Sequence, residues 1–264
     1  MSTWSDFEVQ CTDYLNGKFG GYADFIHQKG SDSTVSDILV KRPGSMDSFY
    51  IEVKHSPAQC GQFVLIPNLD TCGFEYSAKN SNPINDSSLA IMDYMNGSFD
   101  EFRNAGTRGK PIMFPGSHEV FVDWIIRAYK HKNARFFITN GYIIIPVEEF
   151  GDCFDVSATY RIKRSGSSSV GKRRIESVKD HVMGSGYDVT GFHVNRGKLY
   201  VYSTMPLHDH RFILDGTEYM FSTRDDRYEI RRLSNTYNAN VIFSIQLRPS
   251  VTSMTDSEFI ECLK

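Results

Sequence analysis

The chain has 264 residues, of which 29 are Lys or Arg, 32 are Asp or Glu and about 40% are apolar, a composition that excludes disorder and fibrous structure. No segment approaches the ~18 consecutive apolar residues of a membrane span, and the first residues lack the basic and apolar regions of a signal peptide, so we expect neither membrane insertion nor secretion. The net charge of −3 hides an asymmetry, because residues 1–150 carry 13 basic and 18 acidic side chains whereas residues 161–248 carry 15 and 9.

Three elements are predicted near the N-terminus. Apolar residues at helical spacing predict an amphipathic helix over residues 3–17, and residues 22–28 favour a short strand. Segments 35–41 and 48–55 alternate apolar and polar side chains around the turn-forming residues 42–47. These two segments therefore predict an antiparallel strand pair.

The middle of the chain changes character twice. Residues 57–116 are rich in Asn, Ser, Gly and Pro, and we interpret them as an insertion outside the core with one helix over 87–102. Ser117 can cap a strong helix over 118–130. Two short buried strands, 135–139 and 142–146, then flank an Asn-Gly turn.

Strand-like segments dominate the chain beyond residue 150. They cover residues 158–163, 191–194, 199–203, 211–214, 218–222 and 241–247, and the Gly/Ser-rich stretch 165–171 between them is predicted to be a flexible loop. We expect an α/β core over 1–150 with an insertion at about 57–116. The β-rich region 151–264 is either a second domain or part of the same one.

The five cysteines are scattered along the chain and form no C-x-x-C pair. This pattern favours reduced thiols over a disulfide framework or a zinc site. We therefore expect a cytoplasmic location.

Two carboxylates and one lysine are predicted to converge in the strand pair. Asp37 belongs to its first strand, and Glu52-Val53-Lys54 ends the second. Alternation turns Glu52 and Lys54 to the same side. Carboxylates at this spacing suit Mg²⁺, which can activate water and neutralise charge during phosphodiester hydrolysis. The alternative is an exposed Glu/Lys pair on a surface strand.

With these residues in place, the chain resembles the PD-(D/E)xK nuclease superfamily, and within it the type II restriction endonucleases. The resemblance covers residues 7–139, including the chain's single [DE]-x-K tripeptide. It implies a restriction-endonuclease-like α/β fold, a central mixed sheet flanked by helices. Ser36 stands where the motif's name places proline, a position without a chemical role.

The resemblance also implies a role for each acid. Asp37 and Glu52 would hold Mg²⁺, and Lys54 would orient or help deprotonate the attacking water. Glu8, in the first helix, would be an outer-shell or second-metal acid.

Several neighbours are candidate accessory residues. Gln62 lies eight residues after Lys54, where related nucleases sometimes place a glutamine, although a polar loop residue is the alternative. His55 should face away from Lys54 and be structural or phosphate-facing. Weaker alternative acids are Asp24, Asp32 and Asp47.

Two basic sets are candidates for DNA binding. The first has six cations and no acid between them, and we expect phosphate contacts from Arg161, Lys163, Arg164, Lys172, Arg173 and Arg174. The second offers guanidinium and amide groups suited to base edges, from Arg224, Arg227, Arg231, Arg232, Asn235 and Asn238. The alternative for both is an ordinary solvated surface.

Two other patterns carry less weight. The segment 166–173 is similar to a phosphate-binding loop, but Arg173 follows the lysine where Ser or Thr would ligate Mg²⁺. His208 and His210 lack further ligands at zinc spacing, so a turn between strands is favoured.

Together these patterns predict a type II restriction endonuclease that cleaves double-stranded DNA with Mg²⁺ and leaves 5′-phosphate ends. A palindromic site favours a homodimer, and a companion DNA methyltransferase is a further candidate partner. The alternatives are a repair or junction-resolving nuclease of the same fold and a non-catalytic DNA-binding protein that kept the fold.

Overall fold

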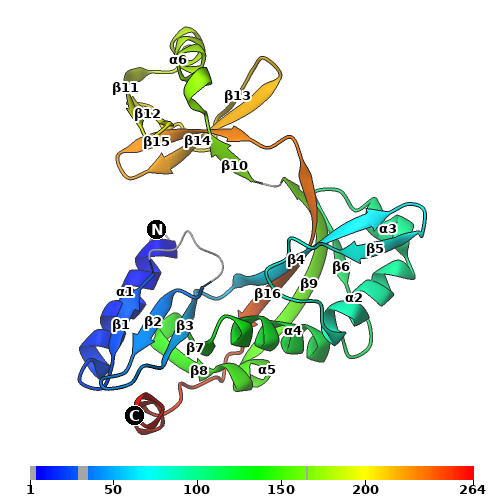
Figure 1. The fold of residues 1–264 in the computed structure, drawn as a ribbon, viewed down its shortest axis with the longest axis vertical. Coiled ribbons are helices and arrows are strands. Elements are labelled where there is room, and N and C mark those ends of the chain that lie inside the picture. The colour runs from blue at the N-terminus through cyan, green and yellow to red at the C-terminus, as the bar shows by residue number, and fades with distance from the viewer. Residues whose placement is uncertain (1–3, 29–34, 165) are drawn as a thin grey trace. The chain divides into compact units, whose positions relative to one another are not determined.

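The computed structural model describes residues 4–28, 35–164 and 166–264. These residues form two compact units (Figure 1): unit 1 comprises Met1–Ile162 and Ala239–Lys264, and unit 2 comprises Lys163–Asn238. The boundary predicted near residue 150 therefore lies at residue 163, and the last 26 residues belong to unit 1 rather than to a separate C-terminal region. Within the described ranges, no helix has the length and apolar character that crossing a membrane requires.

The first sheet of unit 1 is built on the predicted hairpin. Its strands, in spatial order, are β1 (Asp24–His27), β2 (Ile38–Lys41), β3 (Ser48–Lys54), β7 (Ala134–Thr139) and β8 (Ile143–Pro146). The antiparallel pairing of β2 with β3 is confirmed, with Ile38 opposite Ile51. Strand β7 runs parallel to β3, so the sheet is mixed.

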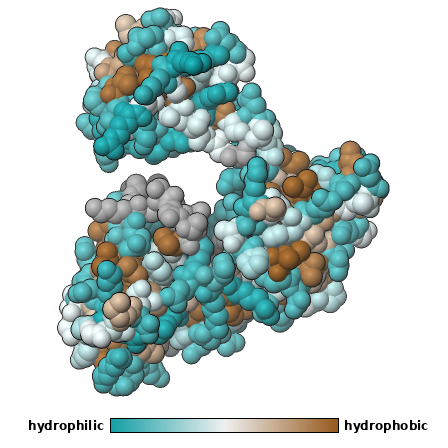
Figure 2. All heavy atoms as spheres, viewed as in Figure 1, coloured by the Kyte–Doolittle hydropathy of each residue, from teal (hydrophilic) through white to brown (hydrophobic). Residues whose placement is uncertain are grey.

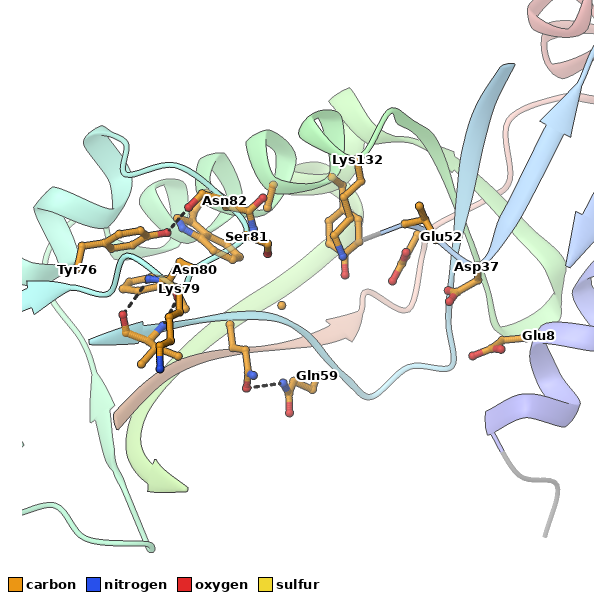
Figure 3. A pocket seen from close by; sticks show the side chains of 18 residues that line it. Glu8, Asp37, Glu52, Gln59, Tyr76, Lys79, Asn80, Ser81, Asn82 and Lys132 are labelled. Atoms are coloured by element: carbon orange, nitrogen blue, oxygen red, sulfur yellow. Dashed lines mark hydrogen bonds between the residues drawn. The ribbon is translucent and has the colours of Figure 1, made fainter. Parts of the chain in front are cut away.

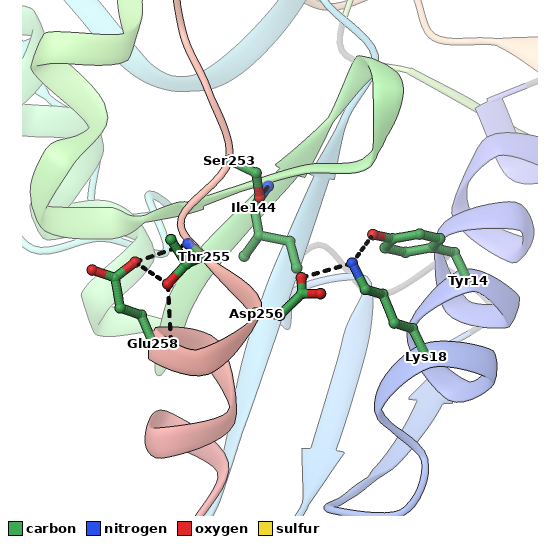
Figure 4. A network of polar contacts seen from close by, with 7 residues as sticks. All are labelled: Tyr14, Lys18, Ile144, Ser253, Thr255, Asp256 and Glu258. Carbon is green, nitrogen blue, oxygen red and sulfur yellow. Dashed lines mark hydrogen bonds and ion pairs between the residues drawn. The ribbon is translucent and has the colours of Figure 1, made fainter.

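Helices α1 (Trp4–Phe19) and α7 (Asp256–Leu263) pack on one face of this sheet. The predicted first helix is confirmed, but α7 was not anticipated. Its start is fixed by a capping box in which Thr255 and Glu258 satisfy each other's backbone N–H groups. Figure 4 shows that Lys18 of α1 is paired with Asp256, which ties the two helices together.

The segment 57–116 is not an insertion outside the core, so that interpretation is wrong. It supplies three strands of the second sheet, whose spatial order is β5 (Gly73–Tyr76), β4 (Ala58–Asn68), β16 (Tyr237–Leu247), β9 (Phe154–Arg164) and β6 (Lys110–Ile112). It also supplies two helices, α2 (Asp86–Asn96) and α3 (Phe99–Arg103), in place of the single predicted one. Apolar side chains of these elements are buried in one large core.

The predicted helix α4 (Ser117–His131) is confirmed and shares that core with both sheets, but its N-cap is Gly116, and Ser117 is the first helical residue rather than the cap. On the first sheet, Phe137 faces this core while its neighbours Phe136 and Ile138 face the α1 side. On the second sheet, Gly61 has a φ of +92° and lies so close to the Trp124 ring that a Cβ would be 2.8 Å from it. Glycine is therefore required where β4 passes over α4. Helix α5 (Phe150–Cys153) and the short turns η1 (Asn140–Tyr142) and η2 (Val147–Glu149) complete the unit.

Unit 2 is a six-stranded antiparallel sheet with one helix. The strand order is β11 (Val189–Asn195), β12 (Lys198–Ser203), β15 (Arg227–Leu233), β14 (Thr217–Arg224) and β13 (Arg211–Leu214), and β10 (Ser167–Ser169) also pairs with β15. The predicted flexible loop is thus partly a strand. Turn η3 (Lys172–Arg174) leads into helix α6 (Ile175–Gly184), which buries Val178 and Val182 against the sheet.

The visible surfaces of both units are mainly hydrophilic, with apolar residues in separate patches (Figure 2). Separate apolar patches of this kind are normal for a globular protein. The two units differ in net charge. Unit 2 has 13 Lys and Arg against 9 Asp and Glu, a net charge of +4, which leaves −7 for unit 1.

Candidate active site

The hairpin brings the predicted acids together at one end of the first sheet. Asp37 directly precedes β2, and its Oδ2 accepts a hydrogen bond of 2.8 Å from the backbone N–H of Val53 in β3. Glu52 and Lys54 extend from the same face of β3, and their side chains form an ion pair. The predicted convergence of Asp37, Glu52 and Lys54 is therefore present in the structure.

Burial and a neighbouring negative charge both oppose ionisation of Asp37. Burial is the main cause that raises the pKa of Asp37 to about 7, and the charge of Glu52 raises it further. The Lys54 ammonium and the Val53 N–H act in the opposite direction. Burial is the largest single influence on Lys54 and lowers its pKa, but the attraction to Glu52, Cys60 and Asp37 and the hydrogen bond to Glu52 together outweigh it and raise the pKa. The site thus has more negative charge than its one lysine balances.

Glu8 lies on α1 beside these acids but has a partner of its own. Its Oε2 is 3.0 Å from His27 Nε2 on β1, and both side chains are largely buried. The interaction holds Glu8 at the edge of the site. The sequence did not point to His27, because α1 and β1 meet only in the folded sheet.

A pocket of about 500 Å³ opens from the acids. Figure 3 shows Glu52, Asp37 and Glu8 at one end of the pocket and Tyr76, Lys79 and Asn80 at the other. Gln59 and Gln62 of β4 and Lys132 also line it. Gln62 is therefore a strand residue that faces the pocket, and its Oε1 accepts a hydrogen bond from Gln59 Nε2 at 3.3 Å.

The chemistry of the donors fits Mg²⁺. The carboxylates of Asp37 and Glu52 are hard oxygen ligands, and their excess negative charge would be relieved by a divalent cation. No three His, Cys, Asp or Glu side chains of the described residues form a preformed metal cluster. Two carboxylates are nevertheless enough, because Mg²⁺ usually keeps several waters and binds substrate phosphate oxygens.

The remaining acids and His55 lie apart from this set. His55 packs edge-on against Phe7 of α1, with ring centroids 4.8 Å apart, and so faces away from Lys54 as predicted. Asp24 and Asp47 are exposed. Asp32 lies outside the described residues. Among the described acids, Asp37 therefore remains the candidate metal ligand beside Glu52.

The first basic set is less uniformly charged than its sequence suggests. Arg164 is paired with Glu218, and Arg174 with Asp215 at 2.9 Å. The exposed cations without an acidic partner among the described residues are Lys163, Lys172 and Arg173. Arg161 belongs to unit 1, where its Nε is buried in β9.

The second basic set is organised by a buried acid. Glu229 is fully buried on β15, and its two oxygens accept hydrogen bonds from Arg224 Nε at 3.1 Å and Arg231 Nη1 at 3.0 Å. Arg231 also donates to Ser167 of β10, at 3.0 Å. The two guanidinium groups are therefore held in fixed positions.

The same face of the sheet carries aromatic side chains. Arg227 lies over the ring of Tyr200, 4.5 Å from its centroid, and donates to the hydroxyl of Tyr202 at 3.2 Å. Helix α6 packs on the opposite face, where Ile230 is buried. Arg232 and Asn235 are exposed. Asn238 takes part in interactions of its own and ends unit 2.

His208 and His210 lie between β12 and β13, in the predicted turn. Asp209 between them has a φ of +62°, a conformation typical of turns. His208 Nδ1 is 2.9 Å from the Thr223 hydroxyl. The described residues around this turn form no metal-ligand set.

Sequence reasoning missed the pocket residues that come from distant segments. Tyr129, Lys132 and Asn82 line the pocket, yet none belongs to a motif that the sequence displays. Asn82 Oδ1 and Trp124 Nε1 in the pocket wall are buried without hydrogen-bond partners among the described residues. Only the fold could reveal these positions, because they depend on where α4 and the segment after β5 meet β4.

Comparison with known proteins gives one full-length match. A search of solved structures finds HhaI endonuclease in complex with DNA, with 39% sequence identity, a TM-score of 0.83 and 99% of both chains covered. No protein-family profile and no curated protein sequence matches the chain significantly. The structural match spans both units, so unit 2 has a counterpart in that endonuclease.

Proposed function

The chain belongs to the same family as HhaI endonuclease, and on this premise we propose that it is a type II restriction endonuclease that cleaves double-stranded DNA at a specific sequence. One observation carries the proposal. Asp37, Glu52 and Lys54 meet at the hairpin of a chain that is similar to an endonuclease over 99% of its length. The predicted restriction-endonuclease-like α/β fold agrees with this match.

Asp37 and Glu52 would hold Mg²⁺ between them. When bound there, Mg²⁺ supplies charge neutralisation at the phosphate and a bound water of lowered pKa. The hydrogen bond from the Val53 N–H fixes the Asp37 carboxylate against the end of β3, so the spacing of the two acids is set by backbone geometry. Glu8, fixed by His27, stands next to them as an outer acid.

Lys54 would orient the attacking water. Its ammonium has three N–H donors, of which Glu52 accepts one and the Val53 carbonyl accepts another at 3.3 Å. The third donor has no partner among the residues that the structure describes and would hold a water molecule. The raised pKa of Lys54 keeps this group cationic, so it acts as a donor and a positive charge rather than as a base.

The reaction is a hydrolysis in which water adds to phosphorus and the bond from phosphorus to the 3′ oxygen breaks. The oxygen of water remains on the 5′-phosphate, and the departing 3′ oxygen takes up a proton. The excess negative charge of the transition state would be stabilised by the nearby cations, and a bound Mg²⁺ would supply further neutralisation.

The charge of unit 2 also supports DNA as the substrate. Its net charge of +4 and its ordered arginines suit a polyanion, whereas unit 1 is net acidic around the catalytic pocket. The exposed residues Lys163, Lys172 and Arg173 are the candidates for phosphate contacts. Arg224, Arg227 and Arg231 are more rigidly placed and suit more specific contacts.

The test is digestion of a sequenced plasmid by the purified protein in Mg²⁺. Discrete fragments whose ends share one short sequence are expected, with 5′-phosphates at every end. Fragmentation without sequence preference would instead support a repair or junction-resolving nuclease. Binding without any cleavage would support a DNA-binding protein that kept the fold.

The same digestion tests the predicted homodimer. Each chain has one catalytic pocket among its described residues, so cutting both strands at once requires two copies. We expect linear plasmid without a nicked intermediate, and a dimer mass on cognate DNA. A nicked circle that accumulates before the linear form, together with a mass of one chain per duplex, would contradict the dimer.

A further inference from the structure

The catalytic pocket has two lysines in different situations. Lys54 is paired with Glu52 and nearly buried, and it is absent from the described residues that line the pocket. Lys132 does line the pocket, and Figure 3 shows it next to Glu52. The lysine that the motif identifies is therefore not the one that an incoming phosphate meets at the pocket wall.

Lys132 is held at this position by an aromatic ring. It is the C-cap residue directly after α4, and its ammonium lies 5.3 Å from the ring centroid of Tyr129. Lys54 lies 5.8 Å from the same centroid. Tyr129 is itself buried, and its hydroxyl accepts a hydrogen bond from the Cys60 thiol at 3.7 Å. One fixed aromatic ring thus holds both ammonium groups at the catalytic site.

The charge of Lys132 has no acidic partner within the described parts of the chain, although the pocket contains three carboxylates. Lys130, which lies two positions earlier, is different: its ammonium is paired with Glu148 at 2.9 Å. A half-buried lysine without a carboxylate partner, in a pocket beside catalytic acids, is suited to bind an anion from outside.

We propose that Lys132 binds a non-bridging oxygen of the backbone phosphate at or next to the bond that is cut. This inference rests on the proposed function, because it assigns that phosphate to the pocket of Asp37 and Glu52. The ammonium neutralises charge on the bound strand and on the transition state. Tyr129 keeps it in place without pairing it, so its full charge remains available for DNA.

The experiment compares Lys132→Ala, Lys132→Gln and Lys132→Arg with the matched control Lys130→Ala, each in the full chain. DNA binding is measured over a salt series in Ca²⁺, and single-turnover cleavage is measured in Mg²⁺. Melting curves establish that each variant is folded. Both lysines lie at the same helix end, so the control separates a phosphate contact from an effect on the helix dipole.

We expect Lys132→Ala and Lys132→Gln to reduce the log–log salt slope by about 0.9, the value for one phosphate contact. Cleavage should fall by about 10²-fold, as for the loss of one charge stabiliser in an active site. Lys132→Arg should restore the slope, and Lys130→Ala should change neither quantity. A Lys132→Ala variant that behaves like Lys130→Ala in both measurements would overturn the inference.

The outcome is separable from that of the proposed function. If the wild-type protein cleaves no duplex, the proposed function fails, while the salt slopes of the variants still decide whether Lys132 contacts phosphate. If the wild type cleaves and only the Lys132 inference fails, all variants cut at the wild-type rate.

Discussion

Each of the two units contains a buried glutamate. Negative charge is in excess around the glutamate of unit 1, and positive charge is in excess around that of unit 2. In unit 1, Glu52 lies beside a second acid, Asp37, and one cation, Lys54. In unit 2, Glu229 is paired with two arginines, Arg224 and Arg231. A buried charge requires compensation. The first site is left short of positive charge and the second has an excess of it.

This difference indicates what each unit is built to receive. Excess negative charge at Glu52 and Asp37 suits a cation such as Mg²⁺. Excess positive charge around Glu229 suits an anion, and its fixed geometry suits one with a regular arrangement of phosphates. Under the proposed function, the same residue type would therefore serve a metal site in one unit and a DNA-binding surface in the other.

The largest expected effect is at the acidic site. Glu52→Ala or Asp37→Ala should remove the metal site. Single-turnover cleavage should fall by at least about 10² to 10⁴-fold, the range that positioned catalytic groups contribute. Folding and much of the DNA affinity should remain. Asp47→Ala, an exposed acid at the tip of the same hairpin, is the control. Mg²⁺-dependent cutting at the wild-type rate by either active-site variant would refute the assignment.

Lys54→Ala tests the same comparison, because it removes the cation that is paired with Glu52 and whose charge also lowers the pKa of Asp37. We expect a loss of about 10² to 10⁴-fold in cleavage. DNA affinity in Ca²⁺ should be nearly unchanged, because the Lys54 side chain is mostly buried and is not among the residues that line the pocket. Full activity would leave the metal site intact but would remove the role in orienting water.

In unit 2 the corresponding change is Glu229→Ala, which leaves two arginines without their buried partner. The sheet should lose about 1–3 kcal/mol of local stability, a value discounted because Arg224 is half-exposed. Hydrogen exchange of the β14 and β15 amides measures this loss. Glu176→Ala, which removes an exposed pair with Lys179, is the control. Equal exchange in both variants would show that Glu229 does not organise the arginines.

Neutralising Asp37 while keeping its shape should stabilise the metal-free protein. The pKa of Asp37 is about 7 when folded and 3.8 in the unperturbed group. Between these values the folded state holds a proton that the unfolded state has lost, so stability falls as pH rises from about 4 to 7. Asp37→Asn removes that dependence and still accepts the Val53 hydrogen bond.

In EDTA, Asp37→Asn should therefore be more stable than the wild type by roughly 4 kcal/mol at pH 8, and by roughly half of that at pH 5. Urea unfolding at the two pH values gives both differences. An advantage that is equal at pH 5 and pH 8 would mean that Asp37 is not held in its protonated form by burial and Glu52.

The convergence of the candidate catalytic residues could be predicted from sequence, because these residues are close together in the chain. Asp37, Glu52 and Lys54 belong to one hairpin, so strand alternation alone places them together. Tyr129 and Lys132 reach the pocket from α4, and His27 reaches Glu8 across the first sheet. No pattern in one sequence encodes such tertiary contacts, which is why these residues were missed.

The helices and strands also divide into those that a local sequence pattern predicts and those that it does not. Helix α4 and the β2–β3 hairpin have strong periodicity and were predicted. Strand β4 was hidden, because the register shift opposite residues 242–244 and the glycine at 61 break its alternation. Helix α7 was missed although Thr255 and Glu258 form a capping-box signature that the sequence displays.

The smallest expected effects are in the first basic set, where pairing decides which cations are available. Lys172 and Arg173 are exposed and without an acidic partner among the described residues, whereas their neighbour Arg174 is paired with Asp215. If unpaired cations contact phosphates, each contact releases counterions. Lys172→Ala and Arg173→Ala should then each lower the log–log salt slope by about 0.9 and weaken cognate and random duplexes alike.

Arg174→Ala should change the salt slope less, because Asp215 already neutralises that side chain. Salt titrations in Ca²⁺ on both duplexes compare the three variants. A loss of about 1–3 kcal/mol on the cognate duplex alone would indicate base contacts instead of phosphate contacts. If neither affinity nor slope changes in Lys172→Ala and Arg173→Ala, this set is a solvated surface. The DNA contacts of unit 2 would then belong to the face that Glu229 organises, where the guanidinium groups are already fixed in place.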